Sequence, residues 1–311
     1  AWADVTLNQD VSAAHIAAGR LRFLPAANDI GSPYATIGFR VSDGIDVSVA
    51  AYTLTIDVVD VNDAPVITVP GAQSTNEDTP LVVAGTSVAD VDAGAGSIQI
   101  QLATTNGTTT LASLVGLSFT VGDGTADAAM TFSGSLADIN AALGNLNFTP
   151  TANFNGAALL TISANDLGNT GAGGPQSDSD SITINVVATN DTPVANAVSQ
   201  STNEDAPVTI TLTGSDVDGD ALTFAIATAP SQGTTGAVTQ LTPTSASVTY
   251  SPVANFNGGD SFTFQVNDGS GNSAPATVTI TVVPTDDPPV ANAITPPPFD
   301  EDVQSVITLS Y

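Results

Sequence analysis

Short runs with an apolar residue at every second position recur along the whole chain. In residues 261–266 (SFTFQV), Phe262, Phe264 and Val266 alternate with polar neighbours, and residues 277–282 (TVTITV) show the same alternation. A period of two in β-branched and aromatic runs, bounded by Gly, Pro, Asn and Asp, is typical of strands with one buried face. Many such strands separated by turns predict an all-β protein built from β-sandwiches.

Two segments depart from this alternation. Residues 135–144 (SLADINAALG) favour a short helix, because Ser135 is placed to cap it, Asp138 falls in its first turn and Gly144 can end it. Residues 11–20 (VSAAHIAAGR) are the counterpart of this segment in the first part of the chain.

The strands belong to an internal repeat, marked by three similar linkers. The linkers read VVDVNDAPV at 58–66, VATNDTPVA at 187–195 and VPTDDPPVA at 283–291. Between them the same landmarks follow in order: a Glu-Asp segment, an Asp-x-Asp turn, an Asn-Phe-Asn-Gly segment and a strand that ends in Asn-Asp. The repeat predicts the C-terminal part of a domain over 1–61, a complete long domain over 62–189 with a short helix near 135–143, a complete short domain over 190–285, and the N-terminal part of a further domain over 286–311.

The charge of the chain is strongly one-sided. It has 31 acidic and 3 basic residues, a net charge of −28, and neither Lys nor Arg from Val41 onward. Such a chain repels phosphate backbones and anionic lipid surfaces, so we expect no nucleic-acid partner. The sequence has no run of about 18 apolar residues, so we expect no membrane insertion. With 42% hydrophobic residues the chain has ample material for a core, and it has no cysteine for disulfides or thiolate metal sites.

Glutamate occurs at one position of the repeat and nowhere else. Glu77, Glu204 and Glu301 each lie 13 or 14 positions after the Asp of the preceding linker (Asp63, Asp191 and Asp287). A residue type confined to one repeat position has a specific task there. Beside other carboxylates and almost no cations, that task is to hold a hard metal ion.

These landmarks resemble cadherin-like repeats, in particular the VCBS-type tandem repeats of large bacterial surface adhesins. The linker VDVNDAP is similar to the cadherin linker motif, and TPTANFNG, VNDG and VNDAP are similar to the bacterial repeat. The resemblance covers essentially the whole chain. It implies tandem Greek-key β-sandwich domains of cadherin or immunoglobulin-like type, arranged end to end, with Ca2+ bound at their junctions.

The resemblance also implies the ligands, position by position. The first junction would use Asp60, Asn62 and Asp63 of the linker with Asp90, Asp92 and Asp166 of the following domain. The second would use Glu77 of the preceding domain with Asn190, Asp191, Asp216, Asp218 and Asp268. The third retains Glu204, Asp286 and Asp287. Animal cadherins carry an acidic motif where this chain has the neutral segments 152–156 and 254–258, so we expect fewer or weaker calcium sites.

Simple electrostatics gives such a junction a mechanism. Carboxylates about 5 Å apart repel each other by roughly 3 kcal/mol per pair at an effective dielectric constant near 20. A junction without a cation should therefore flex, and a calcium ion should make it rigid. The predicted function is a calcium-rigidified spacer or stalk of a bacterial adhesin, extracellular and at the cell surface, which supports cell adhesion and has neighbouring repeats of the same protein as partners.

Other interpretations remain open. The Asp-x-Asp turns, Asp166 and Asp268 are also ordinary turn formers, and 216–220 resembles the start of an EF-hand loop, although position 12 would be Ala227. Residues 171–180 (GAGGPQSDSD) are a binding loop or, as we favour, a flexible tip. The whole chain is alternatively a subunit of a self-assembling fibre or surface layer through homotypic assembly or, less favoured, a carbohydrate-binding module. His15, the single histidine, has no neighbours in the sequence that suggest catalysis, and we expect that the protein is not an enzyme.

Overall fold

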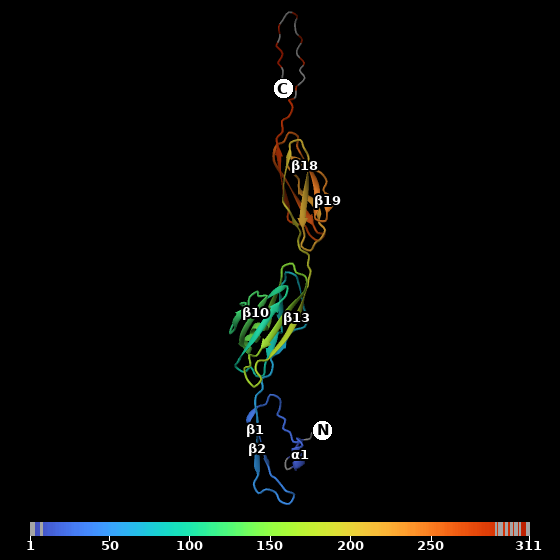
Figure 1. Ribbon diagram of the computed structural model, residues 1–311. Coiled ribbons are helices and arrows are strands. Elements are labelled where there is room, and N and C mark those ends of the chain that lie inside the picture. The colour runs from blue at the N-terminus through green and yellow to red at the C-terminus, as the bar shows by residue number, and fades with distance from the viewer. Residues whose placement is uncertain are drawn as a thin grey trace. The chain divides into compact units, whose positions relative to one another are not determined.

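The chain forms two compact units, Ala1–Thr189 and Asn190–Tyr311, in which nearly all regular structure is strand (Figure 1). The computed structural model describes residues 4–6, 9–289, 291, 295, 298, 301, 304 and 306–308. Most of the domain part predicted over 286–311 therefore lies outside the described residues. Each unit is described by itself.

Unit one contains a hairpin followed by a sandwich. Its helices are α1 (Ala13–Ala17) and α2 (Leu136–Leu143). Its strands are β1 (Gly31–Phe39), β2 (Tyr52–Val58), β3 (Val66–Thr68), β4 (Gln73–Asn76), β5 (Leu81–Ala84), β6 (Ser87–Ala89), β7 (Ser97–Thr104), β8 (Gly107–Thr110), β9 (Ser118–Val121), β10 (Ala129–Ser135), β11 (Asn145–Pro150), β12 (Gly156–Asn165) and β13 (Ser177–Val187).

Strands β3 to β13 form the long sandwich. One sheet has the order β4-β13-β12-β7-β10-β9, and it faces the smaller sheets β5-β11-β8 and β3-β6. Apolar residues alternate along β7, where Ile98, Ile100 and Leu102 are buried, as a strand with one core face requires. The predicted helix is present as α2, with the Ser135 hydroxyl accepting from the Asp138 N–H at its start.

Unit two contains the short sandwich. Its strands are β14 (Val194–Ala195), β15 (Val198–Asn203), β16 (Val208–Ser215), β17 (Thr223–Thr228), β18 (Gly233–Thr235), β19 (Thr239–Thr242), β20 (Ser245–Pro252), β21 (Gly258–Asn267) and β22 (Ala276–Val283). The sheet β14-β16-β20-β18, to which β19 adds along β20, packs on the sheet β15-β22-β21-β17. Phe262, Phe264 and Val266 are all buried, which confirms the alternation predicted for this strand.

Both sandwiches divide their first strand between two sheets. In the short sandwich β14 pairs antiparallel with β16, and the chain then crosses over so that β15 runs parallel to the last strand, β22. In the long sandwich β3 pairs antiparallel with β6, and β4 runs parallel to β13. The repeat in the sequence is therefore a repeat of topology, and the chain is an all-β protein with immunoglobulin-like sandwiches.

The hairpin of β1 and β2 carries an apolar face that stays exposed. By the repeat, Ile37 and Phe39 correspond to the core positions Phe262 and Phe264 of β21. Here Ile37 is 46% and Phe39 is 45% exposed, and the Phe39 ring lies against Tyr52 at 5.9 Å between centroids. Within the described residues this face therefore contributes to no sandwich core.

The short sandwich buries a charged group. Asp260 is 6% exposed, and its Oδ2 accepts from the Tyr250 hydroxyl at 2.9 Å and from the Gln232 N–H at 3.0 Å. Its Oδ1 accepts from the N–H groups of Ser231 and Ser261. Burial alone would raise the pKa of Asp260, but the Tyr250 hydroxyl and the backbone donors outweigh it and hold the pKa below its usual value.

The long sandwich replaces this polar pair with an apolar one. Phe148 and Ala158 stand at the positions of Tyr250 and Asp260, and both are buried. Each aromatic ring packs at the same place, since a Cβ on Gly107 would meet the Phe148 ring and a Cβ on Gly233 would meet the Tyr250 ring. The two residues have therefore changed together between the two sandwiches.

The Asp that follows Glu77 and the Asp that follows Glu204 each hold a turn. Asp78 and Asp205 adopt left-handed backbone angles, φ 55° and 59°. The Oδ1 of Asp78 accepts from the Asn153 N–H at 3.0 Å, and the Oδ1 of Asp205 accepts from the Asn255 N–H at 3.0 Å. This carboxylate ties the turn to the Asn-Phe-Asn-Gly segment, a role that the repeat pattern alone does not reveal.

We predict that Tyr250 and Asp260 are energetically coupled. Tyr250→Phe should lower the free energy of unfolding of the short sandwich by about 1–3 kcal/mol at pH 7, because the buried carboxylate loses a donor. Asp260→Ala should cost at least as much, and the double variant, which copies Phe148 and Ala158, should cost less than the sum of the two. Denaturant unfolding followed by circular dichroism measures all three, and strict additivity would contradict the coupling.

The same pair makes stability depend on pH. Because folding lowers the pKa of Asp260, its stabilisation is fully present above the usual carboxyl pKa of about 3.9 and is lost as the pH falls through the lower pKa of the folded state. Relative to the double variant, the wild-type protein should therefore lose stability below about pH 4. An unchanged difference between pH 7 and pH 2.5 would show that Asp260 is not anionic in the fold.

We also predict that Asp205→Ala lowers the stability of the short sandwich by about 1–2 kcal/mol, because the Asn255 N–H loses its acceptor and Ala is less favourable than Asp at this left-handed backbone angle. Asp205→Asn keeps an oxygen at that position and should cost less, so it serves as the matched control. Both variants should be measured by denaturant unfolding in chelator, where no metal contributes. Equal losses in the two variants would mean that charge, and not the hydrogen bond, stabilises the turn.

Candidate metal sites in the two units

In unit one, two strand ends bring predicted ligands to the place where the first linker (residues 59–65) enters the sandwich. Asp90 follows the end of β6, and Asp166 follows the end of β12. Asn62 and Asp63 belong to the linker itself. Because β6 and β12 both end at this edge of the sandwich, residues that are far apart in the sequence meet here.

Hydrogen bonds join five of the six ligands predicted for the first junction. The Asp63 N–H donates to Asp92 Oδ2 at 2.5 Å, and the Asn62 side-chain amide donates to Asp166 Oδ2 at 2.6 Å. The Asp92 N–H donates in turn to Asp90 Oδ1 at 2.8 Å. The sixth, Asp60, contributes its backbone carbonyl, which accepts from the Ala172 N–H.

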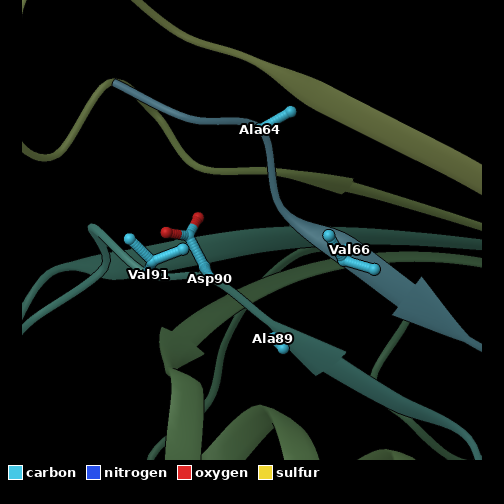
Figure 2. A pocket seen from close by; sticks show the side chains of 5 residues that line it. All are labelled: Ala64, Val66, Ala89, Asp90 and Val91. Atoms are coloured by element: carbon cyan, nitrogen blue, oxygen red, sulfur yellow. The ribbon is translucent and has the colours of Figure 1, made fainter. Parts of the chain in front are cut away.

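Two side-chain oxygens in this group are buried without a hydrogen-bond partner. They are Oδ1 of Asn62, whose residue is 5% exposed, and Oδ2 of Asp90. Figure 2 shows the Asp90 carboxylate directed from the end of β6 toward the linker segment that carries Ala64. A buried polar atom without a partner costs about 1–3 kcal/mol, so these oxygens point to a ligand that accepts their lone pairs.

Unit two repeats the arrangement around the second linker. The Asp191 N–H donates to Asp218 Oδ2 at 2.8 Å, and the Asn190 amide donates to Asp268 Oδ2 at 2.9 Å. The Asp218 N–H donates to Asp216 Oδ1, and Asp216 Oδ2 is again buried without a partner. The orphaned oxygen therefore recurs at the same repeat position in both units.

The second group has one carboxylate more than the first. Ligand oxygens of Asp216, Asp218 and Asp220 lie within 4.8 Å of one another, while the repeat position of Asp220 is Gly94 in unit one. The ligand set predicted by resemblance omits Asp220, although the spacing of Asp-x-Asp-x-Asp was visible in the sequence. At this separation each pair of carboxylates repels by about 3 kcal/mol at an effective dielectric constant of 20.

Local hydrogen bonds keep the strand-end carboxylates anionic. Burial would raise the pKa of Asp166, but the N–H groups of Gln176 and Gly168 and the Asn62 amide hold it below its usual value. The Asn190 amide and the N–H groups of Gly271 and Ser270 lower the pKa of Asp268. Carboxylate and amide oxygens of this kind are the donor set that Ca2+ prefers, and the residues present fit that ion.

The predicted glutamates lie at the other end of each sandwich, where the last strand leaves it. Glu77 is 2% exposed, and its Oε1 accepts from the Thr189 N–H at 2.5 Å. Glu204 is 6% exposed and accepts in the same way from the Thr285 N–H. Asp286 and Asp287 are exposed. The shared sites expected for these residues stay predictions.

The glycine-rich segment of unit one differs from the flexible tip that we expected. Asp178 lies in β13, and its Oδ2 accepts from the Ile67 N–H at 2.8 Å. The glycines before it form a loop that is hydrogen-bonded to the first linker through Ala172. A single glycine-rich stretch thus contains both a strand end and a bound loop, which composition alone does not distinguish.

In the part of the chain that the structure describes, no helix has the length and apolar character needed to cross a membrane.

Comparison with known proteins adds family information for the short sandwich. Residues 190–281 match the family model described as Bacterial Ig domain. No curated protein matches the chain.

Similar solved structures include the endo-fucoidan hydrolase MfFcnA4 from glycoside hydrolase family 107, at 19% identity and a TM-score of 0.28, with 86% of this chain and 38% of that chain covered. Mouse protocadherin-24 EC1-3 matches at 16% identity and a TM-score of 0.41, with 81% and 80% covered. Protocadherin gammaB7 EC3-6 matches at 17% and 0.38, with 79% and 57% covered. The chain thus spans 38% of the length of the hydrolase, and likenesses at these TM-scores carry no functional argument.

Because of the family match, residues 190–281 are similar to bacterial immunoglobulin-like domains, and their fold is the one described for unit two.

Proposed function

We propose that this chain is an extracellular spacer segment of a bacterial surface protein, whose linkers become rigid when they bind calcium and which supports cell adhesion. One observation carries the proposal: the residues after corresponding strands, Asp90 and Asp216, each leave Oδ2 buried without a partner. The two copies of the repeat keep the same unsatisfied oxygen beside a linker. A cation bound by that oxygen and its neighbours supplies the missing interaction.

The donor chemistry favours calcium over other ions. The groups gathered in each unit are carboxylates, one Asn side chain and backbone carbonyls, with neither Cys nor a nearby His in the sequence for a softer metal. Calcium accepts six to eight oxygens in flexible geometry, whereas magnesium requires near-ideal octahedral geometry and retains its waters. Two Asp carboxylates on the turn of unit one, three on that of unit two, and two linker residues in each suit the less demanding ion.

The charge of the chain gives the ion its mechanical role. With no Lys or Arg after Val41, the carboxylates around each linker have no basic side chain of the same segment to pair with. Their repulsion loosens the linker in the absence of metal, and a bound cation converts it into attraction. The ion therefore acts as a clamp between linker and sandwich, with no chemical turnover.

The bacterial immunoglobulin-like match supports the setting of this role. A family of bacterial sandwich domains, present here beside a second sandwich of the same topology, suits a tandem array in which one domain follows another. The partners of each domain are then its neighbours in the array. A spacer of this kind carries a binding domain away from the cell surface.

We predict that calcium stabilises each unit through its own turn. At tenfold excess over the dissociation constant, each site should add about 1.4 kcal/mol to the free energy of unfolding. Asp90→Asn and Asp216→Asn keep the oxygen that accepts the Asp92 or Asp218 N–H but remove the charge. Each should abolish the calcium-dependent shift in thermal unfolding of its own unit and leave stability in chelator unchanged or higher.

Asp123→Asn is the matched control for these variants. Asp123 Oδ1 also accepts an N–H two residues later, from Thr125, but it lies in the turn before β10 and outside both metal groups. It should retain the full calcium shift. If the Asp90 and Asp216 variants retain it too, the orphaned oxygens hold no ion.

We predict that calcium changes the solution dimensions of the chain. Small-angle X-ray scattering in chelator should report a broader distribution of distances than in millimolar calcium, where the maximum dimension should increase and the cross-section should narrow. Magnesium at the same concentration should have little effect. An identical profile in all three conditions would overturn the spacer proposal, and growth of the particle with protein concentration would favour a self-assembling subunit instead.

A further inference from the structure

The loop between β12 and β13 runs beside the first linker and pairs with its backbone. The Asn62 N–H donates to the Ala172 carbonyl at 3.0 Å, and the Ala172 N–H donates to the Asp60 carbonyl at 3.0 Å. Val61 and Ala172 thus form a parallel β-bridge across which the two bonds alternate. These bonds join main-chain groups and require no metal ion.

Side chains extend this pairing to both sides of the loop. The Asn62 amide donates to the Gly174 carbonyl at 3.0 Å, and the Thr170 hydroxyl donates to the Asp92 carbonyl at 2.7 Å. The Asn169 amide donates to the Ser97 carbonyl at 2.8 Å. The loop therefore contacts the linker, the Asp-x-Asp turn and the start of β7 at once.

Glycine makes the close approach possible at one position in particular. Gly171 has φ +88°, and a Cβ there would lie 2.6 Å from the carbonyl carbon of Val61 and closer still to the Asn62 nitrogen. No side chain fits in that space. Gly174 also has a left-handed φ, +75°, but a Cβ on it would meet nothing within 4 Å.

The described residues of unit two include no equivalent of this loop. Its β21–β22 connection, residues 268–275, folds back on itself: Asp268 Oδ1 accepts from the N–H groups of Ser270 and Gly271. A Cβ on Gly271 would meet nothing within 4 Å, so this loop leaves open space around it. Asn190, the counterpart of the buried Asn62, is exposed.

We propose that residues 168–174 form a strap that fixes the first linker to its sandwich independently of metal, so that the first metal group is held more firmly before metal binds than the second, whose linker has no such backbone bridge. The second half of this statement rests on the proposed function, and the first half does not. Preformed ligands lose less conformational freedom on binding, so calcium should occupy the first group at lower concentration than the second. The two linkers then become rigid at different calcium concentrations.

Amide hydrogen exchange of the full chain in chelator tests the strap without reference to calcium. The amides of Asn62 and Ala172 should exchange at least tenfold more slowly than that of Asn190. Gly171→Ala should accelerate both by about tenfold, because it forces the loop off the linker. Gly174→Ala introduces a similar backbone strain with free space around it and should leave Asn62 protected.

Core amides of β12, such as Ile162, report whether each variant is folded. If Gly171→Ala does not fold, the comparison of Asn62 with Asn190 in the wild-type protein still tests the strap. Rapid exchange at Asn62 and Ala172 in the wild-type protein overturns the strap. A calcium titration, followed by amide exchange at Asn62 and Asn190, then shows which metal group binds calcium first. Two separated transitions, with only the first shifted to higher calcium in Gly171→Ala, are expected, and coincident transitions overturn the preformed site. No calcium response, with Asn62 still protected, refutes the proposed function and the ordering while the strap stands.

Discussion

Every buried carboxylate in the two sandwiches must be satisfied without a basic side chain from the same part of the sequence. No Lys or Arg follows Val41, and Asp166, Asp260, Glu77 and Glu204 are nevertheless nearly inaccessible to solvent. Backbone N–H groups, one tyrosine hydroxyl and asparagine amides take the place of ion pairs. Hydrogen bonds to backbone N–H groups hold a carboxylate in a fixed orientation, so this constraint also determines which oxygens remain free beside the linkers.

The two sandwiches act as an internal comparison of which features belong together. The strand order β4-β13-β12-β7, repeated as β15-β22-β21-β17, the divided first strand, the Asp-x-Asp turn and its orphaned oxygen are common to both. Tyr250 with Asp260, the strap and Asp220 each occur in one only. The family model matches residues 190–281, which belong to the short sandwich. A feature that the long sandwich also has is tied to the architecture that the two share, whereas a feature found in one sandwich belongs to that domain alone.

The sequence predicted the parts of the structure that depend on local pattern. Alternation in 261–266 located β21 and its buried face, and the cap at Ser135 with the stop at Gly144 located α2. The hydrogen bond from the Asn255 N–H to Asp205 was not predicted, since the sequence of a turn does not show whether the carboxylate of its Asp accepts a hydrogen bond. The strap was missed for a similar reason: the meeting of Val61 with Ala172 depends on how sheets place distant loops, and glycine-rich composition also fits a free tip. The candidate ligands came from the resemblance, position by position; hydrogen bonds connect five of the six predicted for the first junction within unit one, and their binding of an ion stays a prediction.

The division of the first strand has a consequence for how each sandwich responds to tension. In the short sandwich β15 near the start of the domain runs parallel to β22 at its end, with six residue pairs from Val198–Val278 to Asn203–Val283. A pull on the two ends of such a pair drives the strands past each other in shear, so the hydrogen bonds between them are loaded together and must break nearly at once. Antiparallel strands pulled from one end separate bond by bond instead. The crossover that looks like a detail of topology therefore makes each domain resist stretching in the direction in which its neighbours in a chain would pull.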